Sequence, residues 1–257
     1  MPSPRRSIDW NRWLRRWDRQ QTGYMPYREE RFATMLDIVE ARLAPNARVI
    51  DLACGPGSLS ERLLARLPKA RSIAVDFDPV LLELGRHALH RWRHRLTWVE
   101  ADLRDATWPE RLPSDRVDAV LTTTALHWLT APELTRVYRQ LHALLPEGGV
   151  LMNGDHMAFE PSLPQFRALA KSINRRRTEE GFRDRGAEKW DTWWGALEKE
   201  PLLAPFFAER HRRFPHAHGR DQEYLAHFHE AALKDAGFRE VGTAWQNLDN
   251  RVLLAIA

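Results

Sequence analysis

The chain has 257 residues, of which 43% are hydrophobic, and this suits one α/β domain with an elaboration better than two independent domains. Its formal charge of +4 is too small for a polybasic tail, and its single cysteine, Cys54, excludes an intrachain disulfide. The N-terminus has no signal-like apolar region and no run of about 18 apolar residues occurs, so we expect a cytoplasmic protein without a membrane span.

Residues 1–44 are predicted to form two amphipathic helices that cover the main domain as a lid. Ser7 suits the N-cap of the first helix, and Pro26 suits the first position of the second. A basic helix lying on a membrane surface is a less favoured alternative, because the first helix has little aliphatic surface. The inward faces carry Trp10, Trp13, Leu14 and Trp17, then Phe32, Met35, Leu36, Val39 and Leu43.

Short apolar runs alternate with amphipathic segments over residues 45–157. This alternation is typical of a parallel sheet in a doubly wound α/β fold. Helix start signals lie between the runs, at Ser58 with Glu61, at Asp78 with Pro79 and at Thr130 with Glu133. The apolar runs are Val49–Leu52, Ile73–Val75, Leu96–Val99, Val117–Leu121 and Val150–Met152.

Residues 158–221 break the alternation. Prolines and tryptophans are frequent there and no strand pattern is visible, so we expect a helical insertion after the fifth strand that covers the substrate. Residues 222–257 are predicted to complete the core with a helix, which ends at Gly237, and a hairpin of Arg239–Trp245 and Arg251–Ala257.

The stretch VIDLACGPGSLSERLL, residues 49–64, joins the first predicted strand to its helix through Gly55 and Gly57. Ligands of open parallel sheets bind at such turns, outside the carboxyl ends of the strands. A P-loop would need a lysine after the second glycine, and a dinucleotide fingerprint would need glycine or alanine at Ser60. Asp51 would repel a pyrophosphate, but it suits a ligand with an ammonium group, such as S-adenosylmethionine.

Acids also end the next two predicted strands. Asp76 can accept hydrogen bonds from both ribose hydroxyls, and Asp102 could accept one from an adenine amino group. Three acids in register with the glycine turn therefore predict a crevice for S-adenosylmethionine, with S-adenosylhomocysteine as the product.

Several stretches resemble the ordered motifs of class I S-adenosylmethionine-dependent methyltransferases: DLACGPGSL (51–59), VDFDP (75–79), EADL (100–103), DAVLTTTALHWL (118–129) and LLPEGGVL (144–151). The resemblance implies a Rossmann-like fold, with a seven-stranded sheet whose last strand is antiparallel. It also implies cofactor-binding roles for Asp51, Ala53, Gly55, Gly57, Asp76, Phe77, Asp102, Leu103, Thr123 and Thr124. Ala53 stands where the family often has a further glycine. Tyr24, near the second helix, is expected to close over the cofactor.

His127 and His156 are the candidate catalytic residues, because each follows a predicted strand on the cofactor side. Asp155 could orient His156, although either histidine could instead line the pocket or cap a loop. The ALHWL stretch resembles small-molecule carboxyl methyltransferases of the trans-aconitate type. We therefore expect transfer to a small aromatic or carboxylate-bearing metabolite, at oxygen first. Arg28 and Arg31 could reach a carboxylate there, but we favour their interpretation as solvated helix residues.

Three other interpretations stay open. A metal site at His211, His216 and His218 is not expected, because no cysteine or E-x-x-H pattern accompanies these histidines. The basic stretch at 86–95 could contact RNA, but the signature of base-amine methylation is missing after the fourth strand. A protein that binds the cofactor without transferring a methyl group has the same sequence features.

Overall fold

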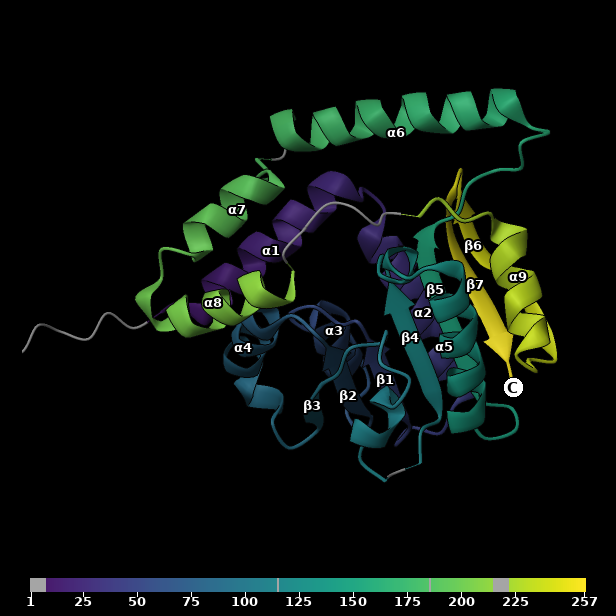
Figure 1. The fold of residues 1–257 in the computed structure, drawn as a ribbon, viewed down its shortest axis with the longest axis horizontal. Coiled ribbons are helices and arrows are strands. Elements are labelled where there is room, and N and C mark those ends of the chain that lie inside the picture. The colour runs from purple at the N-terminus through teal and green to yellow at the C-terminus, as the bar shows by residue number, and fades with distance from the viewer. Residues whose placement is uncertain (1–7, 115, 185, 215–221) are drawn as a thin grey trace, which may run out of the picture.

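One seven-stranded sheet with helices on both faces forms the body of the molecule in a computed structural model (Figure 1). The structure describes residues 8–114, 116–184, 186–214 and 222–257. The strand order is β3-β2-β1-β4-β5-β7-β6, and β7 runs antiparallel to both of its neighbours, which confirms the predicted fold. The strands are β1 (Arg48–Leu52), β2 (Arg71–Asp76), β3 (Leu96–Glu100), β4 (Ala119–Thr123), β5 (Val150–His156), β6 (Glu240–Asn247) and β7 (Asn250–Ile256).

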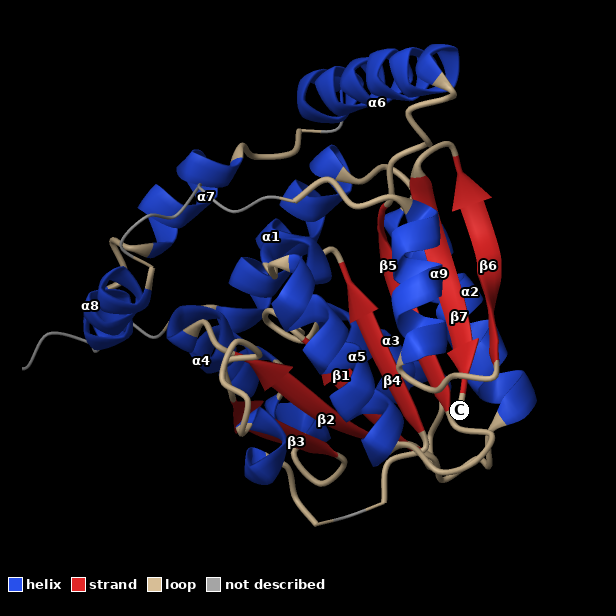
Figure 2. Ribbon diagram, turned by 45° about the vertical axis from the view of Figure 1, so that its right-hand side comes forward, coloured by secondary structure: helices blue, strands red, loops and turns tan. Residues whose placement is uncertain are grey.

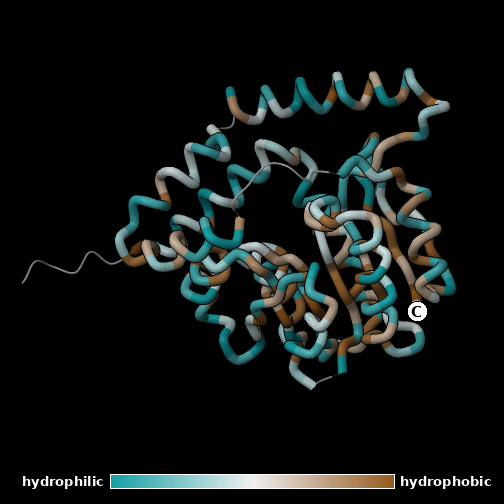
Figure 3. The backbone as a smooth tube through the Cα atoms, viewed as in Figure 1, coloured by the Kyte–Doolittle hydropathy of each residue, from teal (hydrophilic) through white to brown (hydrophobic). Residues whose placement is uncertain are grey.

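The two faces of the sheet are covered by different helices, as Figure 2 shows. Side chains alternate between the faces, so Ile50 and Leu52 join one apolar cluster, packed by α5 and α9, while Val49 joins another, packed by α2 and α3. Figure 3 shows the most hydrophobic segments in the central strands. The helices are α1 (Trp10–Tyr24), α2 (Arg28–Arg42), α3 (Ser58–Arg66), α4 (Pro79–Ala88), α5 (Ala131–Leu144), α6 (Pro164–Asp184), α7 (Trp190–Leu197), α8 (Ala204–Arg213) and α9 (Ala226–Asp235).

Strand β5 is longer than its apolar run predicts. Its polar end, from Gly154 to His156, pairs with β7 from Val252 back to Asn250, and this ladder keeps the strand extended. The consequence is functional, because the longer strand carries Asp155 to the same edge of the sheet as the end of β4.

Two of the three helix caps predicted between the apolar runs are confirmed. The Asp78 carboxylate accepts hydrogen bonds from the first backbone N–H groups of α4, and Thr130 and Glu133 form a capping box on α5. The predicted box at Ser58 is wrong: Gly57 is the N-cap of α3, and the Ser58 hydroxyl donates to Asp18 of α1 instead.

The first two helices begin later than predicted. Asp9 caps α1, and the predicted cap Ser7 lies outside the described residues. Helix α2 begins at Arg28, so Pro26 lies in the preceding turn. The predicted inward faces are otherwise confirmed, since Trp13, Trp17 and Met35 are among the buried residues.

The insertion after β5 consists of α6, α7 and α8. Figures 1 and 2 show α6 and α7 beyond the end of the sheet toward which β4 points. Trp193 of α7 packs on Trp17 of α1, with ring centroids 5.0 Å apart. Helix α6 crosses α1 very closely, since a Cβ on Gly181 would lie 2.9 Å from the carbonyl oxygen of Gly23. None of the described helices is long and apolar enough to cross a membrane.

Candidate active site

The turn between β1 and α3 places three residues in left-handed backbone conformation: Ala53, Gly55 and Gly57, with φ of 54°, 55° and 84°. The two glycines are needed for different reasons. A Cβ on Gly57 would lie 2.7 Å from the Trp98 ring, so Gly57 permits the packing of α3 on the sheet. A Cβ on Gly55 would meet only Trp17 and Leu81 at 3.6 Å or more. Glycine at position 55 is therefore favoured by its left-handed backbone conformation rather than by a lack of space.

Asp51 lies buried at the end of β1. One carboxylate oxygen accepts hydrogen bonds from the Ser60 backbone N–H at 2.9 Å and from the Ser60 hydroxyl at 2.7 Å. Burial raises the pKa of Asp51 to about 6, against the lowering effect of these bonds. The carboxylate thus fixes the start of α3, a structural task that the sequence did not indicate.

Asp76 connects β2 to the glycine turn. One of its oxygens accepts from the Gly55 backbone N–H at 2.7 Å, and the other accepts from the N–H groups of Phe77 and Asp78. Burial also raises the pKa of Asp76 to about 6. The field of Asp76 adds to the raised pKa of Asp51, so the crevice carries concentrated negative charge and favours a cationic ligand.

A cavity of about 430 Å³ adjoins Phe77 and Asp102 at the ends of β2 and β3. The side chain of Asp102 forms an ion pair with Arg104 at 2.7 Å, and Leu103 is buried beside it. The insertion reaches this cavity as well, because the Arg213 guanidinium of α8 lies 4.8 Å from the centre of the Phe77 ring. Sequence analysis missed Arg213, since nothing in its local pattern links α8 to β2.

Helix α1 covers the crevice from the other side. Trp17 lies against Gly55, and Gln20 follows it by one turn on the same helix. The Gln20 side chain is fully buried, and its Nε2 has no acceptor among the described residues. A buried donor without an acceptor is costly, so this region of α1 suits an anionic group such as a ligand carboxylate.

Arg31 is fully buried at the end of β4, which corrects the prediction of a solvated residue. Its Nη1 donates to the hydroxyls of Thr123 and Thr124 at 2.8 and 2.9 Å and to the Gly154 carbonyl at 2.9 Å, while Nη2 donates to Asn250. Thr124 has φ of 56°, a strained value for a β-branched residue. Arg31 therefore holds a strained turn beside the crevice. Its neighbour Arg28 is buried too, in an ion pair with Asp18.

His127 and Asp155 form a pair across the ends of β4 and β5. Nδ1 of His127 lies 2.9 and 3.0 Å from the two oxygens of Asp155, which is 2% exposed. Burial disfavours the charged carboxylate, but His127 and then Arg31 outweigh it and lower the pKa of Asp155. An ionised Asp155 fixes the proton of His127 on Nδ1 and the ring in one orientation.

His156 lies in a different environment. Its side chain is 40% exposed, and its Nδ1 is 3.5 Å from Asp249 in the β6–β7 turn. The prediction that Asp155 orients His156 is wrong, because that carboxylate bonds the His127 ring and only the backbone N–H of His156. Adjacent residues on a strand point to opposite faces, and this separates the two histidines.

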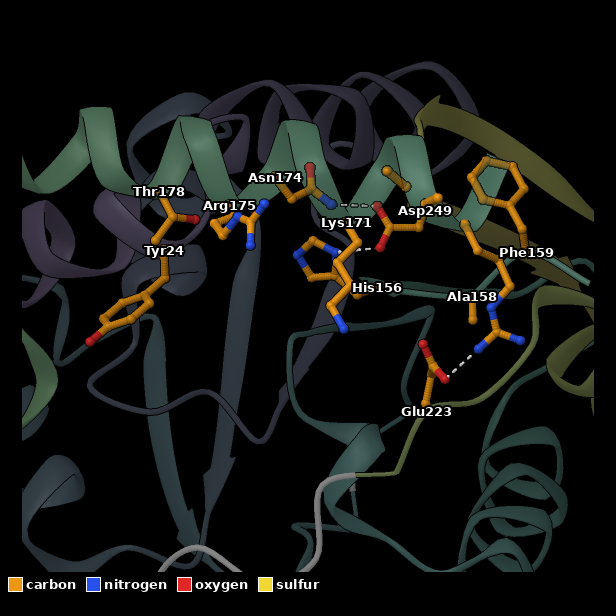
Figure 4. Close-up of a pocket in the computed structure, with 13 residues that line it drawn as sticks. Tyr24, His156, Ala158, Phe159, Lys171, Asn174, Arg175, Thr178, Glu223 and Asp249 are labelled. Atoms are coloured by element: carbon orange, nitrogen blue, oxygen red, sulfur yellow. Dashed lines mark hydrogen bonds and ion pairs between the residues drawn. The ribbon is translucent and has the colours of Figure 1, made fainter. Parts of the chain in front are cut away.

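A second cavity, of about 590 Å³, lies beneath α6 (Figure 4). His156, Asp249 and Tyr24 line it together with polar residues of α6. Tyr24 thus lies at this cavity, and its ring packs edge-on against Phe182 of α6, with the centroids 4.7 Å apart.

Comparisons with known proteins agree with this geometry. Residues 49–149 match the family profile of a methyltransferase domain. The chain is 34% identical over 136 residues to trans-aconitate 2-methyltransferase of Azoarcus sp. (strain BH72), covering 52% of this chain and 49% of that protein. These residues form a class I S-adenosylmethionine-dependent methyltransferase domain.

Two further proteins are similar to this chain. Malonyl-[acyl-carrier protein] O-methyltransferase of Legionella pneumophila subsp. pneumophila (strain Philadelphia 1) is 31% identical over 111 residues, covering 43% of this chain and 36% of that protein. The solved structure of PigF with SAH shares the fold at a TM-score of 0.56 and 16% identity, covering 88% of this chain and 55% of that one. The chain thus spans about half the length, or less, of the curated relatives it matches.

The methyltransferase domain contains the acids of the crevice, the glycine turn and His127. Arg31, Asp155 and all of α6 lie outside the matched residues. The geometry of these three was visible only in the structure. Of the three histidines for which no metal site was expected, His216 and His218 lie outside the described residues, and His211 is exposed, 3.5 Å from Glu198.

Proposed function

We propose that the protein transfers a methyl group from S-adenosylmethionine to a carboxylate oxygen of a small acid. The observation that carries this proposal is the His127–Asp155 pair, which lies at the edge of the sheet beside Thr124 and the cofactor crevice. The names of the relatives support an acidic acceptor, since trans-aconitate and malonyl-[acyl-carrier protein] both carry carboxylates. We also expect the reaction in the cytoplasm, because Cys54 has no cysteine to pair with in the chain.

The residues of the crevice fit the cofactor. Asp76 would accept hydrogen bonds from the ribose hydroxyls, Phe77 would pack on the adenine, and Gln20 would donate to the carboxylate. Asp51 and Asp76 together would favour the positive charge of the ligand. When bound, the cofactor supplies a methyl group on a positively charged sulfur, which leaves as neutral S-adenosylhomocysteine.

The protein's part in the chemistry is to align the acceptor and exclude water. A carboxylate oxygen attacks the methyl carbon as the carbon–sulfur bond breaks, so no proton leaves the acceptor. His127 in its imidazolium form, with a proton on each ring nitrogen, would then donate a hydrogen bond through Nε2 that holds the acceptor in line, while Asp155 accepts from Nδ1 and fixes the ring. For a hydroxyl acceptor, the same ring would instead have to remove a proton.

Substitutions at His127 separate these roles. With trans-aconitate as acceptor, His127→Ala should lower kcat about 100-fold, because a small misalignment is costly in an in-line displacement. His127→Gln, which keeps a donor but is a poor base, should retain about tenfold more activity than His127→Ala. His90→Ala is the matched control, since His90 is exposed and precedes β3 at the opposite edge of the sheet.

The measurement is the release of S-adenosylhomocysteine, with cofactor binding followed separately by calorimetry. Equal loss in the Gln and Ala variants would point to a base and a hydroxyl acceptor. Cofactor binding without product from any acid would contradict the proposal and favour a binding protein that transfers no methyl group.

RNA is a weaker candidate for the acceptor. Several arginines of the basic stretch at 86–95 are already engaged, with Arg91 paired to Glu61 at 2.5 Å and Arg95 bonded to backbone carbonyls of residues 64, 67 and 70. A stretch held in this way offers fewer cations to a phosphate backbone.

A further inference from the structure

Helix α6 has an unusual distribution of polar and apolar side chains. A surface helix usually directs its apolar stripe inward. In α6 the large apolar residues Phe166 and Leu169 are 54% and 55% exposed, while the only buried residues are Ala170 and Gly181. The residues of α6 that line the cavity are mostly polar: Arg167, Lys171, Asn174, Arg175 and Thr178, besides Ala168 and Ala170.

The spacing of these polar residues follows one helix face. They recur at intervals of three and four, so their side chains stack along one side of α6 above the cavity, as Figure 4 shows for the labelled residues. A polar inner face cannot add to a hydrophobic core. It suits a helix that covers a wet cavity and presents side chains to a ligand.

The charges of the cavity do not balance. Arg167 pairs with Glu223 at 2.7 Å, and Asp249 is shared between His156 and Asn174. Lys171 and Arg175 also line the cavity, and no anion pairs with either of them among the described residues. Like charges four residues apart destabilise a helix slightly, so an anion between them would be stabilising.

Three wall residues of the cavity are linked through the chain to groups at the centre where we place methyl transfer. Tyr24 precedes Met25, whose sulfur accepts a hydrogen bond from the Thr124 hydroxyl at 2.9 Å. His156 follows Asp155, the partner of His127.

The third link runs through the strand-like segment before α9. Glu223 follows Gln222, whose backbone N–H donates to the His127 carbonyl at 2.9 Å. The cavity wall therefore combines residues of α1, β5 and this segment with residues of α6.

We propose that the cavity beneath α6 binds an acceptor with at least two carboxylates, and that Lys171 and Arg175 hold the carboxylate that is not methylated. This inference rests on the proposed function, which identifies the methyl acceptor as a small acid. His127 holds the reacting carboxylate at one end, and the two cations of α6 bind the other. Arg175 suits two-point contact with a carboxylate, while Lys171 acts as a point charge. A cavity of about 590 Å³ accommodates a small di- or tricarboxylic acid with water.

The test compares acids that share a carbon framework but differ in charge: trans-aconitate with three carboxylates, glutaconate with two and crotonate with one. Calorimetry with S-adenosylhomocysteine present gives their dissociation constants, and S-adenosylhomocysteine release from fresh cofactor gives KM and kcat. We expect affinity to fall from the first acid to the last and to weaken with salt.

The decisive variants are Lys171→Gln, Arg175→Gln and their combination in the full chain. Each single change should raise the dissociation constant for glutaconate about tenfold, as expected for the loss of a charge-assisted bond, with crotonate unaffected. KM should rise in parallel while kcat changes little. Arg176→Gln is the matched control, since Arg176 lies on the same helix, is 69% exposed and faces Glu180.

Two results would overturn the inference: glutaconate binding unchanged in the double variant, or crotonate binding as tightly as glutaconate in the unaltered protein. The thermal unfolding midpoint of each variant shows that α6 is still folded. If the acids bind in the expected order but no S-adenosylhomocysteine forms, the proposed function fails and the anion site stands. If methyl transfer occurs but KM and the dissociation constant are unchanged in the double variant, the inference fails and the proposed function stands.

Discussion

The crevice that we propose for the cofactor (the cofactor side) and the cavity beneath α6 that we propose for the acceptor (the acceptor side) are built in different ways. On the cofactor side, Asp51 and Asp76 are held by backbone N–H groups at fixed positions of a strand–turn–helix unit. On the acceptor side, Lys171 and Arg175 project from a helix that touches the core through few residues. The first arrangement fixes geometry through the backbone, whereas the second supplies charge on long, adaptable side chains. Substitutions should therefore have different consequences on the two sides.

Arg31 joins the two sides, and its loss should have the largest effect. Arg31→Met would remove one of the two groups that offset the burial of Asp155, would leave Asn250 and the Gly154 carbonyl without their buried donor, and would free the strained Thr124 turn. We expect a loss of about 3 to 5 kcal/mol in the free energy of unfolding, measured by urea denaturation. Arg66→Met, which removes an exposed ion pair to Asp37, should cost no more than about 1 kcal/mol. A similar small cost for both would show that the buried network contributes little.

Asp76→Asn should come next, with an effect on the cofactor side alone. Loss of a charged acceptor should raise the dissociation constant for S-adenosylhomocysteine about 10- to 100-fold. Glutaconate binding through α6 should change far less. Calorimetry with each ligand checks both statements, and equal weakening of the two would remove the distinction between the sides.

The pH dependence of cofactor binding should be smaller. The pKa of Asp76 is raised to about 6, so its carboxyl is mostly ionised at pH 7 and mostly protonated at pH 5. A neutral carboxyl accepts weaker hydrogen bonds, so affinity for S-adenosylhomocysteine should fall about tenfold as the pH is lowered across this window. The Asp76→Asn protein should show a flatter profile. An unchanged slope in that variant would assign the pH effect to other groups.

Ala53→Gly should have the smallest effect. Ala53 has φ of 54°, a conformation that costs a non-glycine residue about 1 kcal/mol. Glycine would remove this strain but add freedom to the unfolded chain, so we expect a change in unfolding free energy within about 1 kcal/mol. Gly55→Ala places a Cβ at φ of 55° and should lower the free energy of unfolding by about 1 kcal/mol. Urea denaturation of the two variants measures how much the left-handed backbone conformation of this turn contributes to stability.

The cofactor side could be predicted from the sequence because its signals are local. The acids that end β1 and β2 stand at fixed distances along the chain from the glycine turn and from the caps of the following helices, as at Asp78. The failure at Ser58 is instructive, since that hydroxyl bonds Asp18, a residue forty positions away. Local spacing cannot reveal such a partner.

The acceptor side depends on contacts between distant segments. His127 was identified from its place after β4, but its partner Asp155 became visible only when β5 was found to extend beyond its apolar run. Arg31 had the pattern of a solvated helix residue, and its burial follows from the packing of α2 against the ends of β4, β5 and β7. The orientation of α6 is likewise a tertiary property.

Gly23 and Gly181 have a consequence for selectivity. Their backbones already touch where α1 and α6 cross, so the spacing of the two helices is at its minimum. A methyl group at residue 181 would lift that end of α6 and enlarge the space below it. If the acceptor binds beneath α6 as we propose, these two positions outside the cavity wall would limit the size of the acid, and Gly181→Ala should shift preference toward bulkier acids in a competition assay.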